Sequence, residues 1–179
     1  MNQAPQTARL FFALWPDPEI QTAFSQAGQL LYGTCKGKPT KVENIHLTMA
    51  FLGDTPVERI GELNAIAASV SCPPFEMNFS QLGWWRHNQV AWATCQEIPN
   101  SLKEFQRQLN EGLRKAGFPA ENRPFVPHVT LLRKARCKGI PPLETAIRWP
   151  VKEFVLVQSQ LDSKGSIYEK IGNWVFANP

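Results

Sequence analysis

The stretch NIHLTMAFL, residues 44–52, is echoed by FVPHVTLLR, residues 125–133, and these two segments decide the expected fold. Each contains a histidine followed two residues later by a threonine: His46 and Thr48 in the first, His128 and Thr130 in the second. The chain has only three histidines and nine threonines among 179 residues, so two such triplets are informative where one would mean little. Both segments read as strands, and period-two alternation turns each histidine and its threonine to the same face.

The same order of elements surrounds both segments. Residues 9–15 predict a buried strand, residues 17–31 a helix with Asp17 as its N-cap and Gly33 past its end, and residues 44–52 the first histidine strand. Residues 89–95, 99–116 and 125–133 repeat that order, and residues 154–161 parallel residues 75–82. We therefore expect one two-lobed domain over residues 1–179, made of internal repeat units at about 9–82 and 89–177, whose equivalent strands face each other across a cleft.

The remaining segments predict fewer regular elements. Apolar spacing indicates a further helix near residues 60–70, and the chain should end in a hairpin of residues 152–161 and 167–176. We interpret residues 84–88 as a turn, and residues 53–56 and 134–150 as loops, because turn-forming residues are frequent there and periodicity is weak.

Composition describes an ordinary globular chain, 43% hydrophobic and 19% charged. No run approaches the roughly 20 apolar residues of a membrane span, and the first seven residues are too polar for a secretory signal, so we expect a cytoplasmic protein. The four cysteines lie far apart without a Cys-x-x-Cys pair, and we interpret all of them as free thiols: Cys35, Cys72, Cys95 and Cys137.

A net charge of +4 and a pI of about 9.0 suit an anionic partner such as a phosphate or RNA. The basic residues include a loose group, Lys36, Lys38 and Lys41, and a denser group over residues 133–138. We interpret the loose group as solvated surface. The denser group directly follows the second triplet, which favours a role at the site.

Two imidazoles and two hydroxyls on one face suit phosphate chemistry. An imidazole pair divides acid and base roles near neutral pH, while hydroxyls and an arginine hold the non-bridging oxygens. Arg133 points to the opposite face of an ideal strand and reaches the site only if the strand ends or bulges near Leu132. One alternative is that both histidines are hydrogen-bonded structural residues of a half-buried sheet. The other is a metal site, although neither triplet has an Asp, Glu or Cys nearby at zinc-ligand spacing.

Residues 9–14, 43–53, 122–133 and 158–168 resemble the bacterial two-histidine phosphoesterases called RNA 2',3'-cyclic phosphodiesterases, also known as 2'-5' RNA ligases. The resemblance implies an α+β, bilobal, pseudo-twofold fold with two antiparallel sheets around a central cleft, helices outside, and no metal or other cofactor. It implies hydrolysis of a terminal 2',3'-cyclic phosphate of RNA to a 2'-phosphomonoester and, by reversal, 2'-5' RNA ligation.

The resemblance also implies roles for six residues. His46 is the proton donor and His128 the proton acceptor, Thr48, Thr130 and Arg133 bind the phosphate, and Phe51 stacks on a base, although alternation assigns Phe51 to the face opposite His46. The implied partner is RNA or an oligonucleotide with a 2',3'-cyclic end, including tRNA fragments, bound by a monomer without a membrane. The alternative function is a non-catalytic module that binds RNA ends or cyclic nucleotides.

Overall fold

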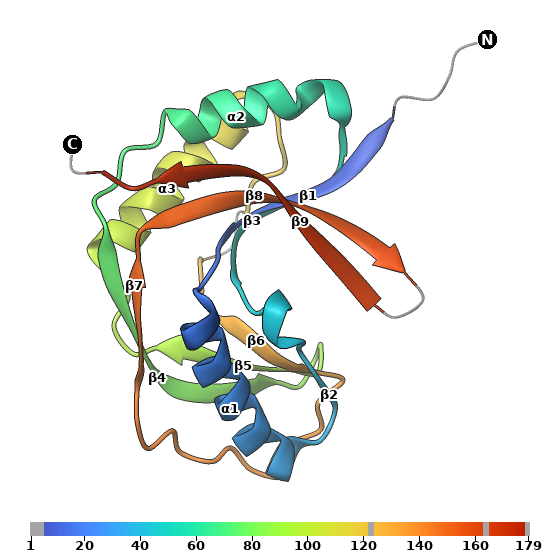
Figure 1. Cartoon of the computed structure of the whole chain (residues 1–179), viewed down its shortest axis with the longest axis vertical. Helices are drawn as coiled ribbons and strands as arrows, with labels where there is room; N and C mark the ends of the chain where they lie inside the picture. The colour runs from blue at the N-terminus through green and yellow to red at the C-terminus, as the bar shows by residue number, and fades with distance from the viewer. Residues whose placement is uncertain (1–5, 122–123, 163–164, 178–179) are drawn as a thin grey trace.

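One antiparallel sheet runs through the computed structural model, which describes residues 6–121, 124–162 and 165–177 (Figure 1). The strand order is β7-β4-β5-β6-β3-β1-β8-β9, with β2 paired to β6. The strands are β1 (Thr7–Leu14), β2 (Lys38–Pro39), β3 (Leu47–Pro56), β4 (Phe75–Trp85), β5 (Val90–Cys95), β6 (Val129–Arg133), β7 (Ile147–Val151), β8 (Glu153–Asp162) and β9 (Gly165–Val175). The helices are α1 (Pro18–Cys35), α2 (Ile60–Ala68) and α3 (Asn100–Lys115), with short 3-10 turns at Val42–Asn44 and Val57–Arg59.

The sheet consists of two halves that meet where β3 pairs with β6, at Leu47 and Val129. The ladders elsewhere are longer, such as the register between β1 and β3 from Thr7 to Leu14. The α+β fold with two antiparallel sheets around a cleft, expected from the sequence, is confirmed, and the two sheets are joined edge to edge at this pair. Among the described helices, none is both long and apolar enough to cross a membrane.

The two halves of the sequence exchange strands across the molecule. Strand β4, from the first half, pairs with β5 and β7 of the second, while β8 from the second half pairs with β1 of the first. Helix α1 likewise packs on β5, β6 and β7, whereas α3 packs against α2 and β3 (Figure 1). Each lobe is therefore built from both halves of the chain.

The apolar runs that predicted strands and helices form the core. Phe12, Phe105 and Phe154 lie fully buried in the main cluster, and the ring of Phe154 contacts the rings of the other two. A smaller cluster lies on the other face of β1 and β8, with Trp15 and Tyr168 packed against it: Phe11, Ala13, Val155 and Val157. This smaller cluster forms an apolar base beside the first histidine.

Several expectations about local structure were wrong where tertiary contacts outweigh local signals. Helix α1 continues past Gly33 to Cys35, because Leu31 and Cys35 are both buried one turn apart. Asp17 does occupy the N-cap position as predicted, but its side chain makes no capping hydrogen bond. Residues 53–56 are not a loop but the end of β3, where pairing with Thr7–Leu10 satisfies their backbone groups.

Two further assignments were wrong for the same reason. Trp84 and Trp85 extend β4 instead of forming a turn, since they pair with Ala91 and Val90. Residues 147–151 form β7 within the expected loop, and its buried Ile147, Trp149 and Val151 alternate with exposed residues as in any half-buried strand. The expected hairpin is present, with residues 163–164 of its turn outside the described residues.

A disulfide joins Cys35 at the end of α1 to Cys137 in the segment after β6. The prediction of four free thiols was therefore wrong for this pair and is confirmed for Cys72 and Cys95, which are free and buried. The two bonded cysteines are 102 residues apart in sequence, and only the packing of α1 against β6 brings them together. Sequence spacing alone gives no sign of that contact.

Candidate active site

The pairing of β3 with β6 brings the two His-x-Thr triplets together. Leu47 and Val129, each the first residue of its strand, pair with one another, so His46 and His128 lie directly before β3 and β6 and not within strands as the sequence predicted. Leu47 and Val129 are fully buried, whereas the four triplet side chains are partly exposed on the other face. The pairing therefore brings the two triplets side by side.

Both histidine strands contain a β-bulge directly after the threonine. Opposite β1, Thr48 and Ala50 pair with Ala13 and Phe12, which leaves Met49 as an extra residue. Opposite β5, Thr130 and Leu132 pair with Trp92 and Ala91, which leaves Leu131 as an extra residue. In each case the extra residue and the next one are both buried, so the alternation of faces shifts by one position.

The bulges decide where Phe51 and Arg133 point. Both residues stand five positions after a histidine, and both are exposed on the face of the preceding threonine. The face that simple alternation assigned to Phe51 was therefore wrong, and the condition stated for Arg133, a bulge near Leu132, is met at Leu131. The two residues occupy equivalent positions of the repeated units.

Each histidine binds a backbone carbonyl through Nδ1. His46 Nδ1 lies 2.7 Å from the carbonyl oxygen of Asn44, and His128 Nδ1 lies 2.9 Å from that of Val126. A carbonyl only accepts, so Nδ1 donates in both rings, and Nε2 of the neutral imidazole carries the free lone pair. His46 Nε2 lies 3.2 Å from Thr48 Oγ1. Both histidines thus offer Nε2 for proton transfer.

Aromatic rings enclose both imidazoles, in different geometries. The ring of Trp15 stacks on His46 at 5.0 Å between centroids and 5° between planes, and Tyr168 meets the same imidazole edge-on at 5.4 Å. His128 has an edge-to-face contact with Trp85 at 4.6 Å. Aromatic faces cannot solvate an imidazolium as water does, so both environments favour the neutral ring.

Burial lowers the pKa of His46 from 6.5 to about 4, against the opposing effect of the Asn44 carbonyl. The positive charges of Arg133 and His128 lower this pKa further. Burial also lowers the pKa of His128, against the effect of the Val126 carbonyl, and Arg133 again adds to the shift. Arg133 therefore lies within electrostatic reach of both histidines, and His128 within reach of His46.

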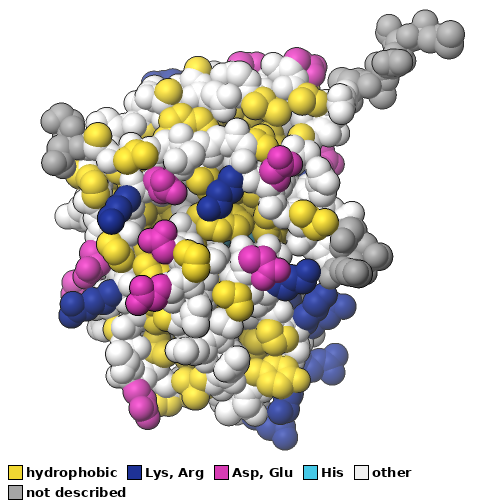
Figure 2. Space-filling view, viewed as in Figure 1, with side chains coloured by type: hydrophobic (Ala, Val, Ile, Leu, Met, Phe, Trp, Pro, Cys, Tyr) yellow, Lys and Arg dark blue, Asp and Glu magenta, His cyan; other side chains and the backbone are white. Residues whose placement is uncertain are grey.

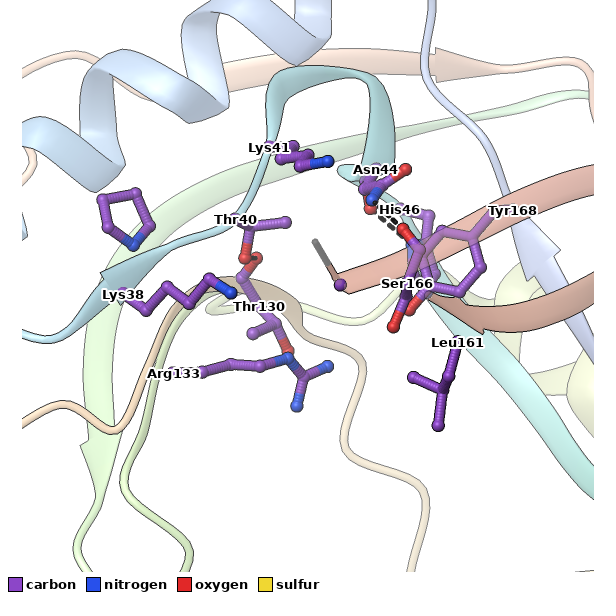
Figure 3. A pocket seen from close by; sticks show the side chains of 12 residues that line it. Lys38, Thr40, Lys41, Asn44, His46, Thr130, Arg133, Leu161, Ser166 and Tyr168 are labelled. Atoms are coloured by element: carbon purple, nitrogen blue, oxygen red, sulfur yellow. Dashed lines mark hydrogen bonds between the residues drawn. The ribbon is translucent and has the colours of Figure 1, made fainter. Parts of the chain in front are cut away.

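A pocket of about 170 Å³ opens beside His46 (Figure 3). Lys38 and Arg133 extend into it from one side, and His46, Ser166 and Tyr168 face them from the other. The described residues that line it are Lys38, Pro39, Thr40, Lys41, Asn44, His46, Thr130, Arg133, Leu161, Gly165, Ser166 and Tyr168. With three cations and no Asp or Glu among these residues, the pocket suits an anion larger than a single water molecule.

The expected site residues fall into three groups. His46, Thr130 and Arg133 line the pocket, while Thr48 and His128 lie beside it through the β3–β6 register. Phe51 lies outside the pocket, 51% exposed, with the Arg9 guanidinium 4.8 Å from its ring centre. Within residues 6–121, 124–162 and 165–177, no three His, Cys, Asp or Glu side chains gather as a metal site.

Several residues at the pocket and around the histidines were not predicted from the sequence. Lys38 and Lys41, interpreted as solvated surface, line the pocket because β2 pairs with β6 at Lys38 and Arg133. Trp15 and Trp85, the rings against the two histidines, were assigned to a strand end and a turn. Trp15 directly follows the first predicted strand, β1, which pairs with β3. That position is the one sequence signal that could have suggested its contact with His46.

Comparisons with known proteins place the chain in a family. Residues 14–92 and 93–168 each match the family model described as LigT-like phosphoesterase. The RNA 2',3'-cyclic phosphodiesterase of Escherichia coli (strain K12) is 30% identical over 167 residues, covering 93% of this chain and 95% of that protein. The enzyme of the same name from Thermus thermophilus is 31% identical over 176 residues, covering 89% and 86%. The crystal structure of E. coli LigT complexed with 3'-AMP superposes with a TM-score of 0.90 at 29% identity, covering 97% of this chain and all of that one.

Proposed function

Since this chain belongs to the LigT-like phosphoesterase family, we propose that it opens the terminal 2',3'-cyclic phosphate of RNA to a 2'-phosphomonoester. The chain is a 2',3'-cyclic phosphodiesterase, and the proposal adds the bond that breaks and the side chains that break it. The observation that supports it most is the pairing of Leu47 with Val129, which brings the two partly exposed triplets side by side.

The proposed reaction is an in-line attack of water on the phosphorus of the five-membered ring. Nε2 of His128 takes the proton of the attacking water, the bond from phosphorus to the 3' oxygen breaks, and Nε2 of His46 protonates that oxygen. Both Nδ1 atoms are held by backbone carbonyls, so each ring exchanges its proton at the atom that faces the site. The products are a 2'-phosphate and a free 3'-hydroxyl.

The bound phosphate completes the electrostatics of this scheme. In the free site the pKa of His46 is about 4, so this ring is neutral at pH 7. A phosphodiester anion beside both rings favours their charged forms and raises both pKa values, which lets His46 carry the proton that it donates. The hydroxyls of Thr48 and Thr130 and the guanidinium of Arg133 bind the non-bridging oxygens, where negative charge grows during attack.

The same two histidines serve the reverse reaction, in which a 5'-hydroxyl attacks and a 2'-5' linkage forms. Hydrolysis should dominate, because water is far more concentrated than any RNA hydroxyl. The partner in either direction is an RNA or oligonucleotide with a 2',3'-cyclic end.

Substitution of each histidine tests the proposal. His46→Ala and His128→Ala should each lower kcat toward uridine 2',3'-cyclic phosphate by about 10²–10⁴-fold, the range expected for loss of a general acid or base. His87→Ala is the matched control, because His87 is exposed in the turn between β4 and β5 and should leave kcat unchanged. Phosphorus NMR of the product should show the 2'-phosphate.

Two outcomes would overturn the proposal. One is full activity in His46→Ala or His128→Ala, in a variant whose circular dichroism spectrum is native. The other is binding of the cyclic nucleotide by the unaltered protein with no product at any pH, which would identify a non-catalytic binding module.

A further inference from the structure

Seven exposed cations extend from the pocket over the adjoining surface. We call them the basic tract: Lys36, Lys38, Lys41, Arg133, Lys134, Arg136 and Lys138. They come from residues 34–42 and 129–139, and neither segment contains an Asp or a Glu. Figure 2 shows Lys and Arg side chains gathered along the lower right edge of the molecule, the side on which Figure 1 places β2.

The two segments of the basic tract are fixed together by backbone contacts. Lys38 pairs with Arg133 in the β2–β6 ladder, the Arg136 amide donates to the carbonyl of Cys35 at 2.7 Å, and the Lys138 amide donates to that of Thr34 at 3.2 Å. The Cys35–Cys137 disulfide closes the same contact. Charges that would repel one another are therefore held side by side by covalent and hydrogen-bonded structure.

Backbone conformation marks the same place. Lys36 has a φ of 47° and Lys134 a φ of 53°, in the left-handed region that non-glycine residues rarely adopt. Each of these lysines begins a turn that leads out of a regular element, α1 or β6. Left-handed non-glycine residues are often found where a surface serves function, so two of them here support a binding role for the tract.

The charges of the basic tract are not neutralised within the described part of the chain. None of the seven cations forms an ion pair with a side chain that the structure describes, whereas Arg59, Arg107 and Lys115 each pair with a glutamate on their own helix or beside it. The tract is thus available to an external polyanion.

We propose that the basic tract binds the phosphodiester backbone of the RNA whose cyclic end occupies the pocket. This inference rests on the proposed function. Lys38, Lys41 and Arg133 line the pocket and belong to the tract, so the two are continuous and share one ligand. A 2',3'-cyclic phosphate is a 3' terminus, and the nucleotides on its 5' side must leave the pocket across a neighbouring surface. The four outer cations, Lys36, Lys134, Arg136 and Lys138, then bind backbone phosphates and make the enzyme prefer RNA to mononucleotides.

Salt dependence separates this binding from catalysis. With single-stranded RNA, log affinity falls with log salt concentration at a slope of about −0.7 per phosphate contact, so four contacts give a slope of about −3. The unaltered protein should show this slope in kcat/KM for a 12-nucleotide RNA with a 2',3'-cyclic end. It should show a much smaller slope for uridine 2',3'-cyclic phosphate, which cannot reach the outer cations.

A fourfold variant tests the tract, with Lys36→Gln, Lys134→Gln, Arg136→Gln and Lys138→Gln combined. It should lose at least about tenfold in kcat/KM for the 12-nucleotide RNA at low salt, lose most of the salt slope, and keep the value for the mononucleotide. A variant with the same charge change, made at exposed cations elsewhere, is the matched control: Lys103→Gln, Arg114→Gln, Arg148→Gln and Lys152→Gln.

Equal salt slopes in the fourfold variant and the unaltered protein would overturn the inference, as would an equal loss in the control variant. Fluorescence anisotropy with a 12-nucleotide RNA ending in a 2'-phosphate measures binding without turnover. If the unaltered protein does not hydrolyse the mononucleotide, the proposed function is wrong. The RNA affinities of the two fourfold variants, measured by anisotropy, would still test whether the basic tract binds RNA.

Discussion

At the scale of residues, the two histidines are alike in their hydrogen bonds and different in their surroundings. Both donate from Nδ1 to the carbonyl two residues earlier, at Asn44 and at Val126, and Nε2 of His46 also lies 3.2 Å from Thr48 Oγ1. His46 lies flat against Trp15, while His128 meets Trp85 edge-on. Burial accordingly lowers the pKa of His46 to about 4, and that of His128 also falls below its usual 6.5.

The pH profile of kcat/KM should report these two values, because it reflects the free enzyme. The active pair holds one proton. Below about pH 4 both rings are charged, and above the lowered pKa of His128 both are neutral, so kcat/KM should peak between about pH 4 and the pKa of His128 and fall on each side. In that window His128, with the higher pKa, holds the proton in most free molecules, and the active form, with the proton on His46, is the minor one. The profile of kcat should lie at higher pH, since the bound phosphate raises both values.

Trp15→Leu provides the control for this assignment. With less aromatic surface against His46, water reaches the ring and its pKa rises, so the acid limb of kcat/KM should move to higher pH. An acid limb that stays in place in this variant would show that it does not belong to His46.

At the scale of elements, the two bulges determine which side chains accompany the histidines. Periodicity alone predicted the two strands, which begin later than expected, at Leu47 and Val129. The shared face of the first triplet is seen in the 3.2 Å between His46 Nε2 and Thr48 Oγ1. The bulges at Met49 and Leu131 could not be predicted from the sequence. Two consecutive apolar residues, such as Leu131 and Leu132, occur both in a bulge and in a strand that is buried on both faces. The faces of Phe51 and Arg133 depend on that difference.

The pairing of β2 with β6 positions Arg133, and Gly37→Ala should disturb this pairing. Gly37 has a φ of 110°, and a Cβ there would lie 2.7 Å from the carbonyl oxygen of Arg133. We expect a loss of about 1–3 kcal/mol in the free energy of unfolding and a several-fold rise in KM for uridine 2',3'-cyclic phosphate, because Arg133 is displaced. Urea denaturation and steady-state kinetics measure the two effects.

Gly139→Ala is the matched control for Gly37→Ala. Gly139 lies in the same region of the chain, but a Cβ there would have no neighbour within 4 Å. A KM that rises equally in both variants, or in neither, would contradict the role given to the β2–β6 contact.

At the scale of the whole molecule, long-range contacts hold the lobes in place. The β3–β6 pair joins residues 82 positions apart, Leu47 and Val129, and the disulfide joins Cys35 to Cys137 over 102. The internal repeat predicted that the two histidine segments would lie near each other, since equivalent strands were expected to face each other across a cleft. Nothing in the spacing of the cysteines indicated the second, because α1 had first to be placed on the strands of the other half.

Reduction of the disulfide should lower stability by an amount set mainly by the long loop that it closes. We expect a loss of about 4.7 kcal/mol in the free energy of unfolding, the chain-entropy value for a loop of this length. For a chain of this length that corresponds to a fall of roughly 9–19 °C in Tm. Calorimetry with and without a reducing agent measures the change.

A double variant, Cys35→Ala with Cys137→Ala, should already have the lower Tm and should not respond to the reducing agent. Cys72→Ala with Cys95→Ala should keep the response, because those buried thiols are unbonded. A Tm that falls equally in all three proteins on reduction would show that the effect does not come from this bond.

The exchange of β4 and β8 between lobes has a consequence for the ancestry of the chain. Each sequence half supplies a strand that its own lobe does not use, and completes its partner's sheet instead. A single ancestral unit of this kind would be incomplete alone, but two identical copies related by a twofold axis would close both sheets and place one histidine from each copy in a shared cleft. Fusion of the two genes would then free each copy to specialise, with phenylalanine at position 51 and arginine at the matching position 133.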